Sequence, residues 1–259
     1  MVALIKHRKI SSYAWIPELP DHRDQLYSTP VEITSALPAS VDLGAQCPPV
    51  YDQGQLGSCQ ANTIAAALQF DQIKQKLAQI FTPSRLLIYY NERVIENTVA
   101  SDSGAQIRDG IKSVSKQGDC PETEWPYVIA QFKIRPPKTF YADALKYKAV
   151  WYQRLARVLS HFKSCLASGY PFVFGFTVYE SFERAPVAKT GHASLPKPGE
   201  SSIGGHAVMC DGYDDARQWL IVRNSWGPKW GMKGYFTLPY SYLISADLAS
   251  DFWTIRLIA

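Results

Sequence analysis

The stretch Asp52-Gln-Gly-Gln-Leu-Gly-Ser-Cys-Gln-Ala61 joins a glycine-rich turn to the start of a predicted helix over 59–76. Apolar residues recur in this helix at the spacing i, i+3, i+4 and i+7, namely Ala61, Ile64, Ala65 and Leu68. Cys59 therefore lies in the first turn of an amphipathic helix, where unpaired N–H groups and the helix dipole favour a thiolate. The pattern leaves two interpretations open: a reactive nucleophile, or a small buried cysteine that only packs.

Composition excludes several classes of protein. The chain has 259 residues, of which 46% are hydrophobic, so it can bury a core as one large or two modest domains. Its net charge of +4 is spread without long basic runs, which predicts no nucleic-acid partner. No apolar run approaches the roughly 20 residues that span a bilayer. The first nine residues lack the layout of a secretory signal, and the compartment stays open.

Five cysteines are present: Cys47, Cys59, Cys120, Cys165 and Cys210. An odd count is consistent with one free thiol and up to two bridges, or with no bridge. A pairing of Cys47 with Cys120 would join the turn before Cys59 to the later proline-rich segment. The chain has no Cys-x-x-Cys pair and no closely spaced His/Cys cluster, so we expect neither a metal nor another cofactor.

The order of the elements predicts an α+β fold. Helical patterns are expected at 59–76, from Thr82-Pro83 onward, at 105–117 and at 155–168. Strand-like runs follow at 171–179, 206–213, 218–224, 234–238 and 252–258, separated by turn residues. Residues 119–140, rich in proline and aromatic residues, indicate a crossover between the two halves. A run of helices followed by a run of strands is the α+β pattern.

Residues 1–38, called the arm below, differ from the rest of the chain. They carry four prolines and little periodicity, so their backbone is expected to be extended in places. A disordered tail is one interpretation. The apolar and aromatic residues Tyr13, Trp15, Ile16, Leu19 and Tyr27 favour an arm that docks on the folded domain.

A cysteine nucleophile needs a base, and the base needs a group that orients it. His206 follows Gly204-Gly205 at the start of an apolar strand, where a loop can deliver an imidazole to a cleft. Asn224 ends the next strand of the predicted hairpin and can hold that ring by a hydrogen bond. The alternative is a histidine that is buried in the core, makes its hydrogen bonds there and has no catalytic role.

Three blocks in this order resemble the papain family of cysteine peptidases: Gln53-Gly-x-x-Gly-Ser-Cys59, Gly205-His206-Ala-Val, and Asn224-Ser-Trp-Gly-x-x-Trp-Gly. His206 lies 147 residues after Cys59, within the roughly 130–150 residues usual in the family. The resemblance covers residues 40–259 in order, and three separated blocks make it specific.

The resemblance implies a role for each matched residue. Cys59 would be the nucleophile and His206 its base, forming a thiolate–imidazolium pair at rest. Asn224 would orient the imidazole, and Trp226 would cover that hydrogen bond. Gln53 would donate its side-chain amide to the oxyanion, with the backbone N–H of Cys59 as second donor.

The same match predicts which residues line the cleft, and it reveals two positions at which this sequence differs from the family. Ser103-Gly104 lies where the family has two glycines that pair with the substrate backbone, and Gly205 would line the opposite wall. Leu56 replaces a half-cystine, so the disulfide pattern of the family cannot be transferred. Gln60 replaces an aromatic residue, which alters packing and removes no catalytic group.

The implied fold has a helical lobe at 39–140 and a β-barrel-like lobe at 141–259, with the active-site cleft between them. The implied activity is that of an endopeptidase, which we expect to be a monomer acting on polypeptide substrates. An acyl transferase or deamidase with the same machinery, and an inactive peptide-binding homologue, are the alternatives. The arm is too short and proline-rich for the usual helical pro-domain. We expect it to dock on residues 39–259 and partly cover the cleft, as in some bacterial members.

Overall fold

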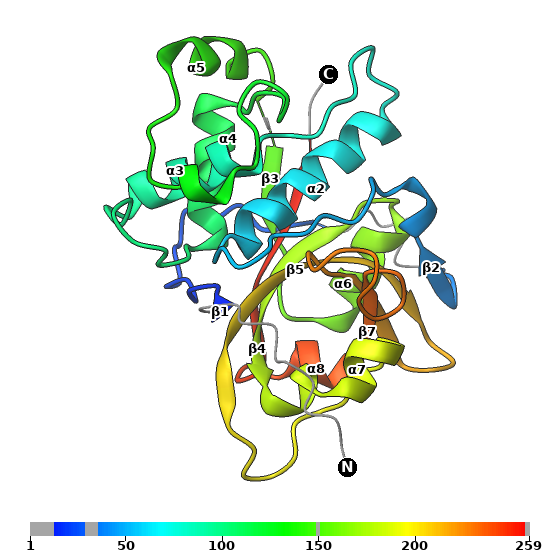
Figure 1. Ribbon diagram of the computed structural model, residues 1–259. Coiled ribbons are helices and arrows are strands. Elements are labelled where there is room, and N and C mark those ends of the chain that lie inside the picture. Colours follow the sequence, from blue (N-terminus) through cyan, green and yellow to red (C-terminus); the bar gives the residue numbers. More distant parts are fainter. Residues whose placement is uncertain (1–12, 29–35, 149–150, 257–259) are drawn as a thin grey trace.

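The computed structural model describes residues 13–28, 36–148 and 151–256. Figure 1 shows a group of helices on one side of the molecule and a twisted sheet on the other. This is the predicted α+β arrangement of a helical lobe followed by a β lobe. Within the described part of the chain, no helix is long and apolar enough to cross a bilayer.

The helical lobe is built around α2. Its helices are α2 (Cys59–Lys74), α3 (Arg85–Ile95), α4 (Ile107–Gln117) and the short α5 (Lys138–Ala144). The predicted one-sided burial of α2 is wrong, because residues 59–72 are all buried, polar ones included. Helices α3 and α4 pack against α2, and so do strands β4 (Phe172–Tyr179), β5 (Ser202–Asp214) and β8 (Ala249–Arg256) of the sheet. α2 therefore joins the two lobes through a shared core.

Helix α3 begins later than predicted. Ser84, rather than Thr82, is its N-cap, and the Ser84 hydroxyl accepts a hydrogen bond from the Leu87 N–H. Pro83 instead forms an isolated β-bridge with Pro121. Val94, in the last turn of this helix, is 45% exposed.

The sheet of the β lobe has eight strands. Six of them follow the order β3-β8-β4-β5-β6-β7, and the other two, β1 and β2, both pair with β5. Apart from the parallel β1–β5 pair, its strands pair antiparallel. Short helices α6 (Leu159–Ala167), α7 (Ala185–Thr190) and α8 (Tyr240–Ile244) accompany the sheet. The strands are β1 (Tyr13–Ala14), β2 (Ser40–Asp42), β3 (Trp151–Arg154), β4 (Phe172–Tyr179), β5 (Ser202–Asp214), β6 (Trp219–Arg223), β7 (Tyr235–Pro239) and β8 (Ala249–Arg256).

The helix predicted over 155–168 is shorter than expected. Strand β3, which the sequence did not predict, precedes it and pairs with β8. Leu155 lies outside the helix, and its N–H donates to the carbonyl oxygen of Phe252 at 2.9 Å. α6 consequently begins at Leu159, and Val158 is exposed.

Residues 13–28 of the arm, which the structure describes together with 36–38, pack against the rest of the chain. Strand β1 pairs in parallel with β5, with Tyr13 opposite Gly204 and Ala14 opposite Gly205. Trp15 is 7% exposed and belongs to the core that surrounds α2. Of the two interpretations of the arm, the structure therefore has the docked one for residues 13–28. Residues 1–12 and 29–35 lie outside the described residues.

All five cysteines lie in described segments, and all five are free thiols. The Cys47–Cys120 bridge considered from the sequence is therefore not formed. Cys47 Sγ donates instead to Asp211 Oδ2 at 3.3 Å, and Cys120 is completely buried.

We therefore predict that the unfolded protein, alkylated without reductant, gains five adducts. A prior reduction step should change neither this number nor the melting temperature, because no covalent loop is broken. Intact-mass spectrometry measures the first quantity and thermal unfolding the second. Three adducts before reduction and five after it would instead reveal one bridge.

Candidate active site

The predicted nucleophile lies where the glycine-rich turn meets α2. Gly54 adopts a positive φ of 63°, and the Gly57 N–H donates to both carboxylate oxygens of Asp102 at 3.0 and 3.1 Å. Cys59 is the first residue of α2 and is 1% exposed. Its Sγ accepts a hydrogen bond from the Ala207 N–H at 3.4 Å. The thiol therefore lies against the strand that carries the predicted base.

The predicted base and its orienter come from neighbouring strands. His206 lies in β5, and Asn224 directly follows β6, which pairs with β5 in antiparallel register. His206 Nε2 and Asn224 Oδ1 are 2.8 Å apart. The Ser225 N–H also donates to Asn224 Oδ1 at 2.8 Å, which fixes the amide. Trp226 stacks on the imidazole with ring centroids 4.9 Å apart and planes inclined by 25°.

Gln53 is tied to the segment that follows Asn224. Its backbone N–H donates to the Ser225 carbonyl at 2.9 Å, and its Oε1 accepts from Ser225 Oγ at 2.6 Å. Gln53 Nε2 donates to the Leu56 carbonyl at 2.9 Å. Through these contacts the structure brings Gln53, Cys59, His206 and Asn224 into one site.

The arm passes directly over this site. The Trp15 N–H donates to the Gly205 carbonyl at 3.0 Å on one side. On the other side, the Ala105 N–H donates to the Ala14 carbonyl at 3.1 Å, and the Ile16 N–H donates to the Ala105 carbonyl at 3.2 Å. Gly205 and Ala105 thus form two walls that hold an extended chain between them.

Ser103 and Gly104, the predicted wall residues, are placed differently. Ala105, one residue further on, makes the backbone hydrogen bonds to the arm. A Cβ on Gly104 would lie 1.7 Å from the Ala14 carbonyl oxygen, so this glycine permits the close approach. Ser103 Oγ donates to the Gly104 carbonyl at 3.1 Å. No pattern in the sequence identified Ala105, because its contribution is made by backbone atoms.

The side chain of Gln60 makes hydrogen bonds that the sequence pattern did not predict. Its Nε2 donates to the carbonyl oxygens of Ala14 and Ala105, the latter at 2.6 Å. One side-chain amide therefore connects α2, the arm and the cleft wall. The sequence indicated only altered packing at this position.

The indole of Trp15 fills a slot in the β lobe. A Cβ on Gly175 would lie 1.9 Å from the Trp15 ring, and one on Gly205 would lie 2.6 Å from it. Trp15 Nε1 donates to Asp251 Oδ2 at 3.1 Å. Two glycines and one carboxylate therefore shape this slot.

A cluster of five charged side chains lies beside this slot. Arg108 contacts Asp24 at 2.6 Å and Glu18 at 3.4 Å, and Arg154 contacts Asp24 at 2.8 Å and Asp251 at 3.3 Å. Three carboxyl groups thus face two guanidinium groups, which leaves one negative charge in excess if all are ionised. Burial, followed by the neighbouring Asp251, raises the pKa of Glu18 to about 7.

Burial also dominates the state of Cys59 while the arm is docked. It raises the pKa of the Cys59 thiol to about 12, against hydrogen bonds from the backbone of Ala207, Ala14 and Gln60 that lower it. The thiolate at rest, expected from the helix terminus and from the family resemblance, stays a prediction, and the burial of Cys59 in this closed state opposes it.

No group of three or more His, Cys, Asp or Glu side chains within the described segments is arranged to hold a metal ion. The side chains that the site brings together are a thiol, an imidazole and two amides. Such a set supports nucleophilic attack by sulfur with proton transfer to the imidazole.

Comparison with known proteins agrees with this geometry. Residues 37–250 match the family model described as papain family cysteine protease. The crystal structure of xylellain, a cysteine protease from Xylella fastidiosa, superposes with a TM-score of 0.92 at 45% identity, covering 99% of this chain and 100% of that one. Digestive procathepsin L 3 from the larval midgut of Tenebrio molitor, at 19% identity and a TM-score of 0.70, shares the fold over 90% of this chain and 74% of its own.

Two sequence relatives extend the comparison. An uncharacterized peptidase C1-like protein of Acanthamoeba polyphaga mimivirus is 49% identical over 213 residues, or 79% of this chain and 68% of that protein. A cathepsin B-like protein of Giardia intestinalis is 30% identical over 208 residues, or 74% of this chain and 64% of its own length. The chain therefore spans slightly less than two thirds of the second relative.

Together the fold and the matches define a papain-like cysteine protease. The chain belongs to the papain family, as the three sequence blocks predicted. Its substrates are accordingly polypeptides.

The charge cluster predicts that docking of the arm depends on pH. The docked Glu18 keeps a proton between about pH 4.5 and 7, which a free arm would release. Docking should therefore be tightest at acidic pH, weaken as the pH rises toward 7, and then level off. Hydrogen exchange of the Trp15 amide, corrected for its intrinsic rate, should show opening that grows by about 10- to 100-fold from pH 5 to 8.

Glu18→Gln provides the control, because glutamine resembles the protonated carboxyl at every pH. Its corrected opening should depend less steeply on pH than that of the wild type, with the remainder coming from Asp251, whose pKa burial also raises. Equal pH slopes in the wild type and in Glu18→Gln would show that this carboxyl does not set the dependence.

Proposed function

We propose that this protease hydrolyses peptide bonds through an acyl-enzyme on Cys59. The observation that carries the proposal is the continuous contact from Cys59 Sγ through the Ala207 N–H to β5, where His206 is held by Asn224 at 2.8 Å. His206 would take the thiol proton as sulfur attacks the substrate carbonyl carbon. The C–N bond then breaks, the amine leaves with that proton, and water hydrolyses the thioester to regenerate the thiol.

Gln53 supports the same reaction as an oxyanion donor. It is 1% exposed, and its bonds to Ser225 and Leu56 hold the amide in one orientation beside the start of α2. The Cys59 backbone N–H lies at the same helix terminus, where such groups have no partner within the helix. Donors held in advance stabilise the charge that develops on the substrate oxygen.

The arm would restrain this activity. Ala14 lies between the two cleft walls, Gln60 binds its carbonyl oxygen, and the Trp15 indole fills the adjacent slot. A substrate chain needs the same two walls, so arm and substrate would exclude each other. Burial of Cys59 beneath the docked arm would also favour the thiol over the thiolate, which would lower its nucleophilicity.

We predict that Cys59→Ala abolishes peptide hydrolysis and that Gln53→Ala lowers kcat by about 10²–10³ through loss of one oxyanion donor. A peptidyl epoxide inhibitor should add once to the wild type, at Cys59, and not to Cys59→Ala. Peptide mapping by mass spectrometry locates the adduct. Cys47→Ala, which changes a half-buried thiol outside the site, should keep both activity and labelling.

For the arm, we predict that Trp15→Ala raises kcat/KM for a short peptide substrate at least tenfold. Truncating a buried tryptophan costs about 3–5 kcal/mol, and here that cost falls on the docked arm. Leu19→Ala is the matched control, since Leu19 lies in the same arm and is 80% exposed. Activity unchanged in both variants, with the fold intact, would refute the restraint.

A further inference from the structure

The rest of the chain holds the side chain of Glu18 as closely as it holds the arm backbone. This side chain is completely buried. The Arg108 N–H donates to Glu18 Oε1 at 2.6 Å, and Trp253 Nε1 donates to both carboxyl oxygens at 3.2 Å. The Glu18 N–H donates to Asp251 Oδ2 at 3.0 Å. Arg108, Arg154, Asp251 and Trp253 therefore form a site, called the Glu18 site below, that binds one residue by its side chain and its backbone.

The donors of the Glu18 site belong to buried, regular elements. Trp253 lies in β8 and is completely buried. Arg108 is the second residue of α4, whose N-cap residue Gln106 makes no side-chain capping bond. Glu18 thus supplies an acceptor that the start of α4 needs. Buried N–H groups without an acceptor are costly, so departure of the arm leaves donors that another acceptor can satisfy.

The charge balance of the Glu18 site also depends on the arm. The arm supplies Glu18 and Asp24, whereas the rest of the chain supplies Arg108, Arg154 and Asp251. Without the arm, one carboxyl group faces two guanidinium groups. A ligand with one carboxyl group restores the balance, and a ligand with an ammonium group adds a third cation.

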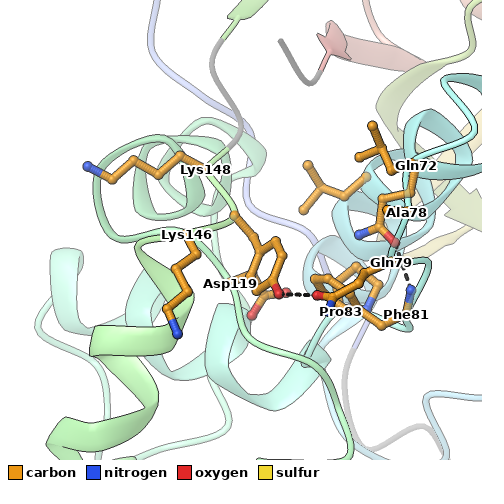
Figure 2. A pocket seen from close by; sticks show the side chains of 11 residues that line it. Gln72, Ala78, Gln79, Phe81, Pro83, Asp119, Lys146 and Lys148 are labelled. Carbon is orange, nitrogen blue, oxygen red and sulfur yellow. Dashed lines mark hydrogen bonds between the residues drawn. The ribbon is translucent and has the colours of Figure 1, made fainter. Parts of the chain in front are cut away.

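A cavity of about 420 Å³ beside the second half of α2 differs from the Glu18 site (Figure 2). Its amide side chains have partners outside the arm: Gln72 Oε1 accepts the Phe81 N–H at 2.9 Å, and Gln79 Oε1 accepts the Tyr147 hydroxyl at 2.6 Å. Those bonds do not involve a segment that a substrate would displace. The acceptor in the Glu18 site does come from such a segment.

We propose that the Glu18 site is a substrate subsite that selects glutamate or glutamine, three residues along the substrate from the residue that fills the Trp15 slot. The proposal rests on the proposed function, because it requires a substrate chain to follow the path of the arm. Glu18 itself lies three residues from Trp15. A site whose buried donors are arranged around an oxygen rejects side chains that lack one.

Glutamine belongs to the proposal for a physical reason. Burial, followed by the charge of Asp251, raises the pKa of the docked Glu18 to about 7. The site therefore holds a protonated carboxyl group over part of the pH range, and an amide resembles that form. Glutamate and glutamine share the stem length and the terminal oxygen that the Arg108 N–H and Trp253 Nε1 require.

The test is a competition between peptides that share one tryptophan and carry glutamate, glutamine, methionine or lysine at a single position. Methionine has the length of glutamine without its oxygen. The variable residue stands three positions before the tryptophan in one series and three after it in the other, because a substrate can follow the path in either direction. Two peptides compete for the full chain in one reaction, and mass spectrometry of cleavage at a common bond gives the ratio of their kcat/KM values. Arm docking cancels in this ratio, since both peptides meet the same fraction of open enzyme.

In one of the two series, glutamate and glutamine should be preferred over methionine by about tenfold or more, and lysine should be the poorest. Hydrolysis of the methionine peptide by the wild type, and not by Cys59→Ala, supports the proposed function by itself. Equal kcat/KM values for all four peptides in both series would overturn the subsite and leave the proposed function intact.

Two variants locate the preference. Trp253→Phe keeps a ring and removes the indole donor, so it should lower the preference for glutamine over methionine by about threefold or more. Arg154→Gln removes one cation and should reduce the discrimination against lysine by a similar factor of about three. The control is Arg217→Gln, which removes the same charge from an exposed ion pair with Asp214 and should change neither ratio.

Arg154→Gln decides the matter if Trp253→Phe does not fold, because the Arg154 side chain lies partly at the surface. Ratios that stay at the wild-type values in the folded variants would refute the Glu18 site as the source of the preference.

Discussion

Everything at the active site depends on the burial of α2. This helix is enclosed by α3 and α4 on one side and by β4, β5 and β8 on the other, so its first residue cannot move independently of either lobe. Cys59 is held by that burial, and β5 carries His206 past it in a register set by pairing with β4 and β6. A nucleophile and its base on separate elements need such a rigid frame, because an error of about 1 Å can cost 10²-fold in rate.

The burial that positions Cys59 also disfavours a negative charge on its sulfur. A helix terminus favours a thiolate, but removing water opposes any isolated charge, and with Ala14 over the site the second effect prevails. If the proposed restraint holds, the docked arm would block the cleft and disfavour the thiolate at the same time. Access and nucleophilicity would then be linked through one segment of backbone.

The sequence was most informative where local patterns carry the structure. The strands near 171–179, 206–213, 218–224 and 234–238 were found close to their predicted positions, because turn residues separate them. The predicted extent of α6 was wrong because β3 pairs with β8, a contact between segments about 100 residues apart. The one-sided burial predicted for α2 failed for a similar reason, since its polar side chains have partners on other elements: Asn62 Oδ1 accepts from Arg85 Nη1, and Thr63 Oγ1 donates to the Ala207 carbonyl.

The candidate active site likewise contains some residues that the sequence could identify and others that it could not. The residue types and order of Gln53, Cys59, His206 and Asn224 predicted that they would lie together, and the structure brings them together, while their catalytic roles stay predictions. Ala105 could not be predicted, because it acts through backbone atoms that any residue possesses. The charge cluster around Glu18 joins the arm to α4, β3 and β8, and no spacing within the sequence brings those elements together.

The two departures from the family pattern acquire a physical meaning together with the arm. Leu56 is 2% exposed, so an apolar side chain fills the place of a half-cystine without a covalent link. Gln60 replaces an aromatic ring by an amide that binds the carbonyl oxygens of Ala14 and Ala105. An aromatic ring there could pack against the arm but could not accommodate both carbonyl groups as a donor, and buried carbonyl groups without donors are costly. The departures near Cys59 are therefore suited to a chain that holds its own backbone in the cleft.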